Sequence, residues 1–352
     1  MNFYIFENLY GEKPHRDETK WNRDAALNSY NIISIILVKE KYKIMEFTSF
    51  ATLVRDEVER NLRISRTGEK YIVRINKVMK NNGVVLSGIT LIHEDSKISP
   101  TIYLNNYYEA YEKGQTTLKT IVKEVVDTYD RNKVSRSVNI SAFMDYEKIK
   151  GRIIYKLINT ERNRELLSDV PSIAFHDLSI VFQCLVSEEK FGNATIMIHN
   201  AHLKIWNITV QELYEAACVN TPKLQKYDIK NMRDIINEMI SDDMQYDELY
   251  CDDNADEQLP MYVLSNQTRV QGASCMLYPD ILKDFSTALN RDIFILPSSI
   301  HELILLPVMG DENCDELKSM VVDINETQVE REEVLSDSVY YYDRTEECIK
   351  ML

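Results

Sequence analysis

His199 and His202 are the two residues whose type and spacing come closest to those of a metal site. Two imidazoles that face the same side can share one zinc ion. The preceding residues, Thr195 to Ile198, alternate like a strand, and side chains three apart on a strand point to opposite faces. A shared metal would therefore need a turn at Asn200 and a third ligand, which the sequence does not supply nearby. We expect hydrogen-bonded structural histidines, no bound metal and no cofactor.

A second group of reactive side chains lies in Ser298-Ser299-Ile300-His301-Glu302, which contains the residue types of a nucleophilic triad. Triad members are positioned by tertiary structure, and neighbours in sequence rarely meet in the required order. Ser298 and Ser299 are better suited to hydrogen bonds within a turn, and His301 has no identified partner that would make it a base. The sequence therefore leaves the catalytic residues unknown.

His176-Asp177 is a third such group, because it could form an oriented acid–base pair. A polar start to a buried strand is the preferred interpretation. If the chain is a hydrolase, its candidate residues are the following: His199, His202, His301, Glu302 and Asp177. A working site would bring the three histidines together with Asp177 in one accessible pocket. We expect that these side chains do not converge.

Several common active-site motifs are missing from the sequence. The chain has 9 glycines in 352 residues, and the closest pair, Gly83 and Gly88, lacks the Lys-Ser/Thr of a phosphate loop. No Gly-x-Ser-x-Gly nucleophile elbow is present. At least 23 residues separate consecutive cysteines, which disfavours a zinc cluster or a redox dithiol. The longest apolar run, 32–38, is far shorter than the ~20 residues that cross a bilayer. We expect a cytoplasmic protein with reduced thiols and no membrane contact.

The charge of the chain is divided unevenly. Residues 241–352 contain 25 Asp and Glu against 7 Lys and Arg, whereas the whole chain has a net charge of -15. An acidic surface repels phosphates and attracts cationic surfaces, so we expect a basic protein partner and no nucleic acid. Tyr340, Tyr341 and Tyr342 could stack on bases, but they lie in this acidic section without a basic groove. The oligomeric state stays open.

Apolar periodicity and turn residues predict the elements that must position these side chains. Expected helices cover the ranges 47–62, 118–129, 144–167, 209–220, 229–239, 279–290 and 317–324. Expected strands cover 71–79, 84–93, 101–104, 177–186, 193–198, 261–264, 292–296, 302–307 and 336–343. The 144–167 helix would have a strongly basic outer face. This mixture without a regular βαβ repeat predicts an α+β fold, with mixed, largely antiparallel sheets of short strands packed against amphipathic helices.

Changes in pattern along the chain suggest its domain organisation. Residues 1–44 lack a period and are interpreted as an extension that could be non-native, and 241–259 as an acidic loop or linker without a Lys or Arg residue. The remaining sections are 45–135, an N-terminal α+β subdomain; 136–240, a middle α+β section; and 260–352, an acidic C-terminal α+β section.

Several strings occur together in the order found in one bacterial family. They are Ser99-Pro-Thr-Ile-Tyr-Leu-Asn105, Asp169-Val-Pro171, Gly192-Asn-Ala-Thr195, Leu296-Pro-Ser-Ser-Ile-His-Glu302 and Val334-Leu-Ser-Asp-Ser-Val-Tyr340. Over about residues 45–344 the chain resembles the family known as domain of unknown function 5688. The resemblance implies domain limits, since family members usually begin near the equivalent of Met45, but it implies no reaction or ligand.

Two classes of function follow from the sequence. The first is a cytoplasmic, non-enzymatic binding or accessory protein whose acidic surface engages a basic protein. The alternative is a hydrolase with a histidine-centred site that could depend on a metal. Because the usual phosphate, metal and nucleophile motifs are missing, the first class is preferred.

Overall fold

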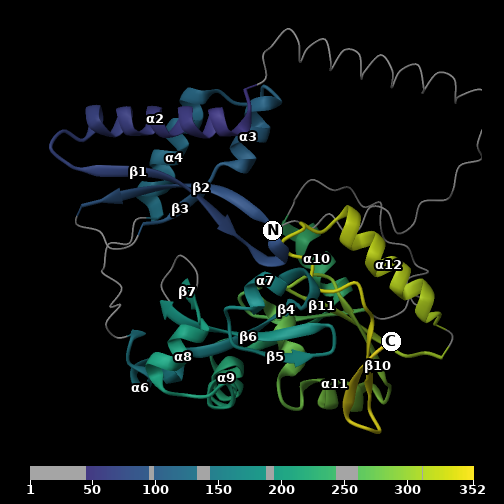
Figure 1. Ribbon diagram of the computed structural model, residues 1–352. Helices are drawn as coiled ribbons and strands as arrows, with labels where there is room; N and C mark the ends of the chain where they lie inside the picture. The colour runs from purple at the N-terminus through teal and green to yellow at the C-terminus, as the bar shows by residue number, and fades with distance from the viewer. Residues whose placement is uncertain (1–44, 95–98, 133–142, 188–193, 243–260, 311) are drawn as a thin grey trace, which may run out of the picture. The chain divides into compact units, whose positions relative to one another are not determined.

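A computed structural model describes residues 45–94, 99–132, 143–187, 194–242, 261–310 and 312–352 (Figure 1). The chain divides into two compact units. The first comprises Met1–Met79 and Val85–Val138, and the second comprises Lys80–Val84 and Asn139–Leu352. The expected N-terminal extension, 1–44, and all but the first two residues of the expected acidic linker, 241–259, lie outside the described residues.

The first unit packs three helices against a three-stranded antiparallel sheet. The helices are α2 (Phe47–Ser65), α3 (Asn105–Glu112) and α4 (Leu118–Asn132), and the sheet has the order β1 (Tyr71–Met79), β2 (Val85–His93), β3 (Thr101–Tyr103). Phe50, Val54, Val58 and Leu62 are buried because their spacing of four puts them on one helical face. The predicted hairpin is confirmed, and its turn residues Asn82 and Gly83 have positive φ angles of 59° and 67°.

The second unit contains two antiparallel sheets. The larger has the order β13-β12-β10-β11-β9-β8, and the smaller has the order β4-β6-β5 with β7 paired to β6. Their strands are β4 (Ile153–Asn159), β5 (Ser172–Phe175), β6 (Leu178–Ser187), β7 (Ala194–Met197), β8 (Tyr227–Asn231), β9 (Tyr262–Asn266), β10 (Ile293–Pro297), β11 (Leu303–Pro307), β12 (Tyr340–Asp343) and β13 (Cys348–Met351). This arrangement confirms the predicted α+β class.

Short and long helices surround these sheets. The α-helices are α6 (Tyr146–Ile149), α7 (Arg164–Leu167), α8 (Asn200–Trp206), α9 (Val210–Leu224), α10 (Met232–Asp242), α11 (Ile281–Leu289) and α12 (Cys314–Thr327). Short 3-10 helices are η1 (Asn81–Gly83), η2 (Lys150–Arg152), η3 (Glu161–Asn163) and η5 (Gly272–Leu277). Within the described ranges, no helix combines the length and apolar character needed to cross a bilayer.

Strand β10 lies inside the larger sheet, between β12 and β11, and all five of its residues are buried. Ile293 and Ile295 pack in the main core, which also contains Tyr155 and Leu157 of β4. The alternate side chains of β10 point the other way and pack with Val321 of α12. The two sheets therefore share one core, and α12 covers the outer face of the larger sheet.

The expected helix over 144–167 is wrong. Only the short helices α6, η2, η3 and α7 occur there, and the middle of the range is strand β4. Six of the seven β4 residues are buried, so the strand shows no alternation of polar and apolar residues. Its apolar positions also fit a helical spacing, which produced the error. The expected single basic face is consequently divided among short turns and a strand.

Two helix boundaries also differ from expectation. Helix α9 continues through Pro222 to Leu224, although Asn220 and Pro222 predicted its end. Ile229 lies in strand β8 rather than in the following helix, which begins at Met232. The predicted capping box at the start of α9 is confirmed, since Thr209 and Glu212 bond to each other's backbone amides.

Four asparagine side chains hold residues 331–336, which connect α12 to β12 without regular structure. We call Asn81, Asn82, Asn159 and Asn325 the asparagine clamp. Their Nδ2 groups donate to main-chain carbonyls: Asn81 to Glu332 (2.8 Å), Asn82 to Arg331 (2.9 Å) and Val334 (2.7 Å), Asn159 to Leu335 (3.1 Å), and Asn325 to Ser336 (2.9 Å). These bonds satisfy carbonyls that no helix or sheet could satisfy.

Replacing Asn82 by Ala should destabilise the second unit by about 3 kcal/mol, because buried carbonyls lose their donors and Ala is strained at positive φ. Asn207 is a matched control, since it is exposed and has a φ of 54°. Asn207→Ala should cost only about 1 kcal/mol, from the backbone strain alone. Urea unfolding measures both values. Equal losses in the two variants would mean that the Asn82 hydrogen bonds contribute nothing.

Candidate binding site: an aromatic recess with a carboxylate rim

The structure brings His199 and His202 together at the start of α8. Their ring centroids are 5.6 Å apart, and α8 begins at Asn200, where the sequence required a turn. The backbone N–H of His199 donates to Nδ1 of His202 at 2.9 Å, and Nδ1 of His199 lies 2.7 Å from Oδ2 of Asp169. Both imidazoles are thus engaged in fixing the first turn of the helix.

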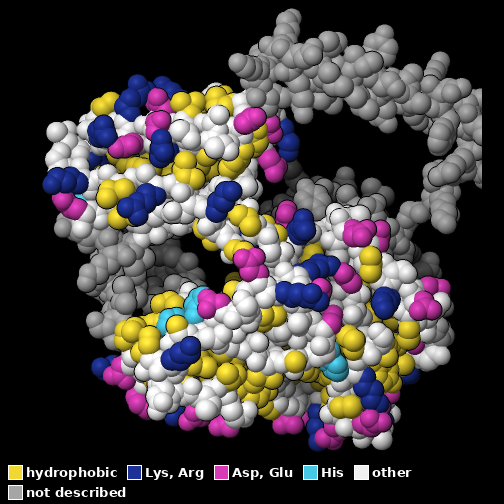
Figure 2. Space-filling model, in the orientation of Figure 1, with side chains coloured by type: hydrophobic (Ala, Val, Ile, Leu, Met, Phe, Trp, Pro, Cys, Tyr) yellow, Lys and Arg dark blue, Asp and Glu magenta, His cyan; other side chains and the backbone are white. Residues whose placement is uncertain are grey.

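His202 is neutral in this arrangement, because its Nδ1 must accept a hydrogen bond. Its ring also stacks on Trp206, with centroids 5.4 Å apart. Among the described residues, no group of three or more His, Cys, Asp and Glu side chains could hold a metal ion. Figure 2 shows histidine side chains beside hydrophobic side chains on the surface over α8.

His301 and Glu302 belong to a different network. Nδ1 of His301 accepts the N–H of Gln271 at 3.1 Å, and its Nε2 lies 3.5 Å from Glu333. Glu302 lies 3.7 Å from Arg269, and burial raises the pKa of its carboxyl despite that charge. Ser299 accepts the backbone N–H of His301 at 3.0 Å, which is a turn hydrogen bond and not a nucleophile–base contact.

Asp177 lies in a third network, where it ties the turn before β6 to the start of β12. Its carboxylate accepts hydrogen bonds from Ser336 (2.6 Å), Ser338 (3.3 Å) and Tyr340 (2.5 Å). His176 instead contacts the carbonyl of Ile349 at 3.1 Å. Within the described chain, none of the hydrogen bonds or ion pairs of Asp177 is shared with His199, His202 or His301.

The pair of His199 and Asp169 resembles part of a catalytic site. The carboxylate orients Nδ1, which leaves Nε2 available as a base, and the His199 side chain is 39% exposed. In the part of the chain that the structure describes, no Ser, Thr or Cys side chain bonds to that nitrogen. The pair therefore has an orienting carboxylate without an identified nucleophile.

A recess beside these histidines has features that the sequence did not reveal. It encloses about 840 Å³ between α6, η2, α8 and α9. Tyr146 and the buried Trp206 form its aromatic floor, with ring centroids 5.9 Å apart. Met144, Ile205 and Val219 are exposed by 47%, 52% and 54% along its walls. Such a group of exposed apolar side chains is typical of a binding surface.

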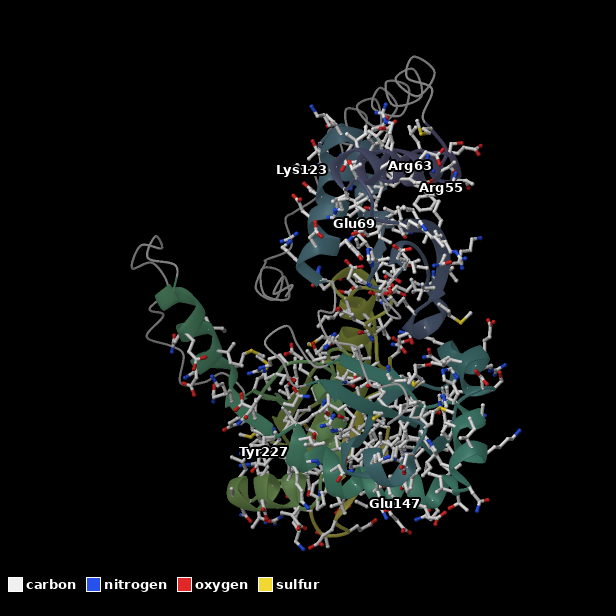
Figure 3. All side chains as sticks on the ribbon, turned by 90° about the vertical axis from the view of Figure 1, so that its left-hand side faces the viewer. Arg55, Arg63, Glu69, Lys123, Glu147 and Tyr227 are labelled. Carbon is white, nitrogen blue, oxygen red and sulfur yellow. The ribbon has the colours of Figure 1, made fainter. Side chains whose placement is uncertain are left out.

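Carboxylates surround the floor of the recess. The Tyr146 hydroxyl is buried without a hydrogen-bond partner. Burial raises the pKa of this hydroxyl, and the charges of Glu212, Glu147 and Glu215 raise it further. Of these acids, Glu147 lies on the surface of the second unit (Figure 3). Lys150 is the cation of the recess lining, with its Nζ 5.7 Å from the centre of the Tyr146 ring. The recess therefore has a negative rim above an unsatisfied polar atom.

Local contacts explain why three separate segments meet here. Asn220 of α9 donates to the carbonyls of Lys150 and Ile153, at 2.7 and 3.1 Å, which fixes α9 beside η2. Trp206 Nε1 donates to the carbonyl of Phe143 at 3.1 Å, which fixes the end of α8 beside the start of α6. Three hydrogen bonds thus join the walls of the recess: the bond to Lys150 is exposed, the bond to Ile153 is half-buried and the bond to Phe143 is buried.

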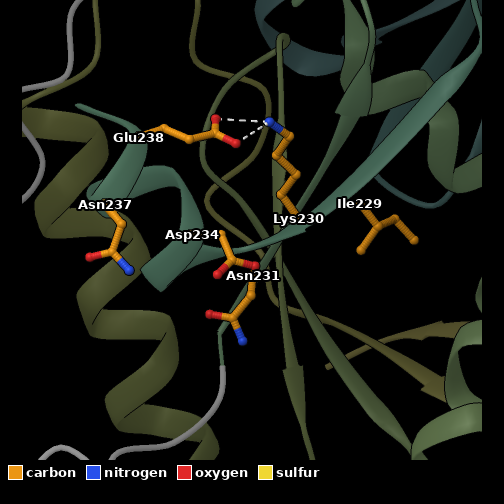
Figure 4. A pocket seen from close by; sticks show the side chains of 6 residues that line it. All are labelled: Ile229, Lys230, Asn231, Asp234, Asn237 and Glu238. Carbon is orange, nitrogen blue, oxygen red and sulfur yellow. Dashed lines mark hydrogen bonds and ion pairs between the residues drawn. The ribbon is translucent and has the colours of Figure 1, made fainter. Parts of the chain in front are cut away.

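A second hollow, between β8 and α10, has different chemistry (Figure 4). It encloses about 550 Å³ and is lined mainly by polar side chains. Lys230 donates to both oxygens of Glu238, at 2.9 and 2.8 Å, so these two charges neutralise each other. Because its lining contains no aromatic side chain, this hollow is a weaker candidate for a binding site.

A model of the family of unknown function DUF5688 matches residues 47–344. The chain belongs to that family. The match includes every residue of the recess and confirms the resemblance suggested by the sequence strings. No curated protein and no solved structure matches this DUF5688 chain.

The stability of this DUF5688 protein should fall in mild acid because of His202. Burial lowers the pKa of His202 from 6.5, the charge of His199 lowers it further, and Asp169 opposes the shift. Since the folded pKa is depressed, the contribution to stability is present above about 6.5 and is lost as pH falls through the folded pKa. NMR titration should place this pKa below 6.5, and Asp169→Asn should lower it again. A His202 pKa above 6.5 would contradict the neutral cap.

Proposed function

We propose that this protein is a non-enzymatic binding protein whose recess receives a basic amphipathic segment of a partner protein. The supporting observation is the buried, unpartnered Tyr146 hydroxyl among three carboxylates, with exposed apolar side chains around it. A soluble apolar ligand alone would leave the hydroxyl unsatisfied, and a small cation alone would leave the apolar walls in water. A segment with both characters satisfies both.

The charges favour a lysine or arginine as the central residue of that segment. Its N–H groups would donate to the Tyr146 oxygen and to the neighbouring carboxylates, which are charge-assisted hydrogen bonds. The methylene groups of its side chain would also pack against the exposed apolar side chains of the recess walls. Met144 adapts easily to different apolar partners because its side chain is flexible. The same negative rim disfavours nucleic acid, whose phosphates it repels.

The acidic rim should determine both the affinity and its salt dependence. We expect a synthetic amphipathic helix of leucine and lysine to bind, and its leucine–glutamate counterpart not to bind. The double variant Glu147→Lys, Glu215→Lys should weaken binding of the lysine helix roughly tenfold, because the rim becomes repulsive. Fluorescence anisotropy at low and physiological salt measures the change, since salt screens charges beyond ~8 Å.

The matched control is Glu326→Lys, Glu330→Lys, which makes the same change of net charge at exposed residues outside the recess. This control should bind the lysine helix nearly as well as the unmodified protein. If it loses as much affinity as the recess variant, binding depends on net charge alone and the recess is not the site.

A hydrolase remains the second candidate, and the hydrogen bond between Asp169 and His199 is what supports it. In such an enzyme His199 would act as the base and Asp169 would orient it. We expect no turnover of ester, peptide or phosphoester substrates by the purified protein. Turnover that His199→Asn abolishes and His301→Asn leaves intact would favour the hydrolase over the binding protein.

A further inference from the structure

One face of the smaller sheet carries two polar side chains that the described residues do not satisfy. In the pairing of β4 with β6, Lys156 lies opposite Val181, and Ile154 lies opposite Gln183. Side chains alternate between faces along a strand, so these four residues share one face. The opposite face of β4 carries Tyr155 and Leu157 into the main core. Lys156 and Gln183 are therefore diagonal neighbours, with Cα atoms about 7–8 Å apart.

Gln183 is only 5% exposed, and its Oε1 is buried without a donor. An unsatisfied buried amide costs about 1–3 kcal/mol, so native proteins usually give such a group a partner. The unsatisfied oxygen points to a group that is not part of the described chain.

The amine of Lys156 lacks a hydrogen-bond acceptor among the described residues. It is partly exposed, and among the described residues no carboxylate or other acceptor bonds to its Nζ. Burial lowers its pKa to about 8, and the charge of Lys80 contributes to the shift. An ammonium held between apolar neighbours and a second cation is destabilised, and an anion beside it would reverse that effect. The amine thus lacks an acceptor while the neighbouring amide oxygen lacks a donor.

We propose that Lys156 and Gln183 form a binding site for an α-carboxylate whose neighbouring atom carries an N–H donor. The carboxylate accepts a hydrogen bond from Nζ of Lys156, and the adjacent amide N–H donates to Oε1 of Gln183. A bare phosphate or acetate would satisfy the lysine but would bring another acceptor towards the glutamine oxygen. The chemistry fits an N-acylated amino acid, which occurs as a free molecule and as the C-terminus of a peptide. This site is independent of the recess between α6, α8 and α9.

Calorimetric titration of the full chain with N-acetylglycine tests the site. We expect binding to N-acetylglycine, at least tenfold weaker binding to acetate, which lacks the N–H, and no binding to N-acetylglycinamide, which lacks the carboxylate. Triglycine distinguishes the two sources: equal or tighter binding indicates a peptide C-terminus, and loss of binding indicates a free acylated amino acid. Failure of N-acetylglycine to bind, or equal binding of acetate, would overturn the proposal.

Substitution of Lys156 or Gln183, and an NMR titration of the unmodified protein, test whether these two residues bind the ligand. Lys156→Met and Gln183→Leu should each reduce affinity at least tenfold, whereas Lys148→Met, at an exposed lysine paired with Asp145, should leave it unchanged. If either site variant fails to fold, NMR titration of the unmodified protein still decides. N-acetylglycine should raise the pKa of the Lys156 amine, because the bound carboxylate favours the charged form. Unchanged affinity in Lys156→Met, or an unchanged pKa with ligand bound, would refute the assignment.

Discussion

The second unit depends on how the free edge of β4 is satisfied. This strand pairs with β6 on one side, and on the other side a helix takes the place of a neighbouring strand. The backbone N–H of Tyr155 donates to the Thr221 hydroxyl at 3.1 Å, and Asn220 donates to the carbonyl of Ile153. An unpaired strand edge buried in a core would be costly, so these side chains are what permit β4 to be buried on both faces.

Several features of the unit follow from this replacement. Because Asn220 also bonds to Lys150, helix α9 lies beside η2, and the recess forms between them. The Thr221 hydroxyl makes two hydrogen bonds. It accepts the N–H of Tyr155 and donates to the carbonyl of Ala217 within the helix. One helical turn therefore satisfies the edge of a sheet and supplies a wall of the candidate binding site. The polar residues Lys156 and Gln183 lie on the face of the same sheet that the main core does not use.

Local features of the sequence predicted local structure well. The hairpin of β1 and β2 follows from Asn82 and Gly83, and the start of α9 follows from Thr209 and Glu212, because each signal involves residues a few positions apart. Strand β4 was missed because its apolar positions also fit a helical spacing, and the residues that complete its edge lie more than sixty positions away in the sequence. A run of β-branched and aromatic residues, Ile153-Ile154-Tyr155, was the available signal for a strand. The recess was missed for the same reason, since its floor and walls come from three separate segments.

The side-chain amide of Asn82, which belongs to the asparagine clamp, can also undergo a chemical reaction. Asn82 precedes Gly83, and a following glycine offers the least steric hindrance to attack of its backbone nitrogen on the asparagine side chain. That reaction, deamidation, would replace the Nδ2 donor with a carboxylate oxygen facing the carbonyls of Arg331 and Val334. In the folded chain both hydrogens of this amide are engaged and the turn is held at positive φ. We infer that deamidation of Asn82 depends on local unfolding of its turn. Molecules in which the turn unfolds are the ones that deamidate, and after deamidation the turn can no longer refold with its original hydrogen bonds.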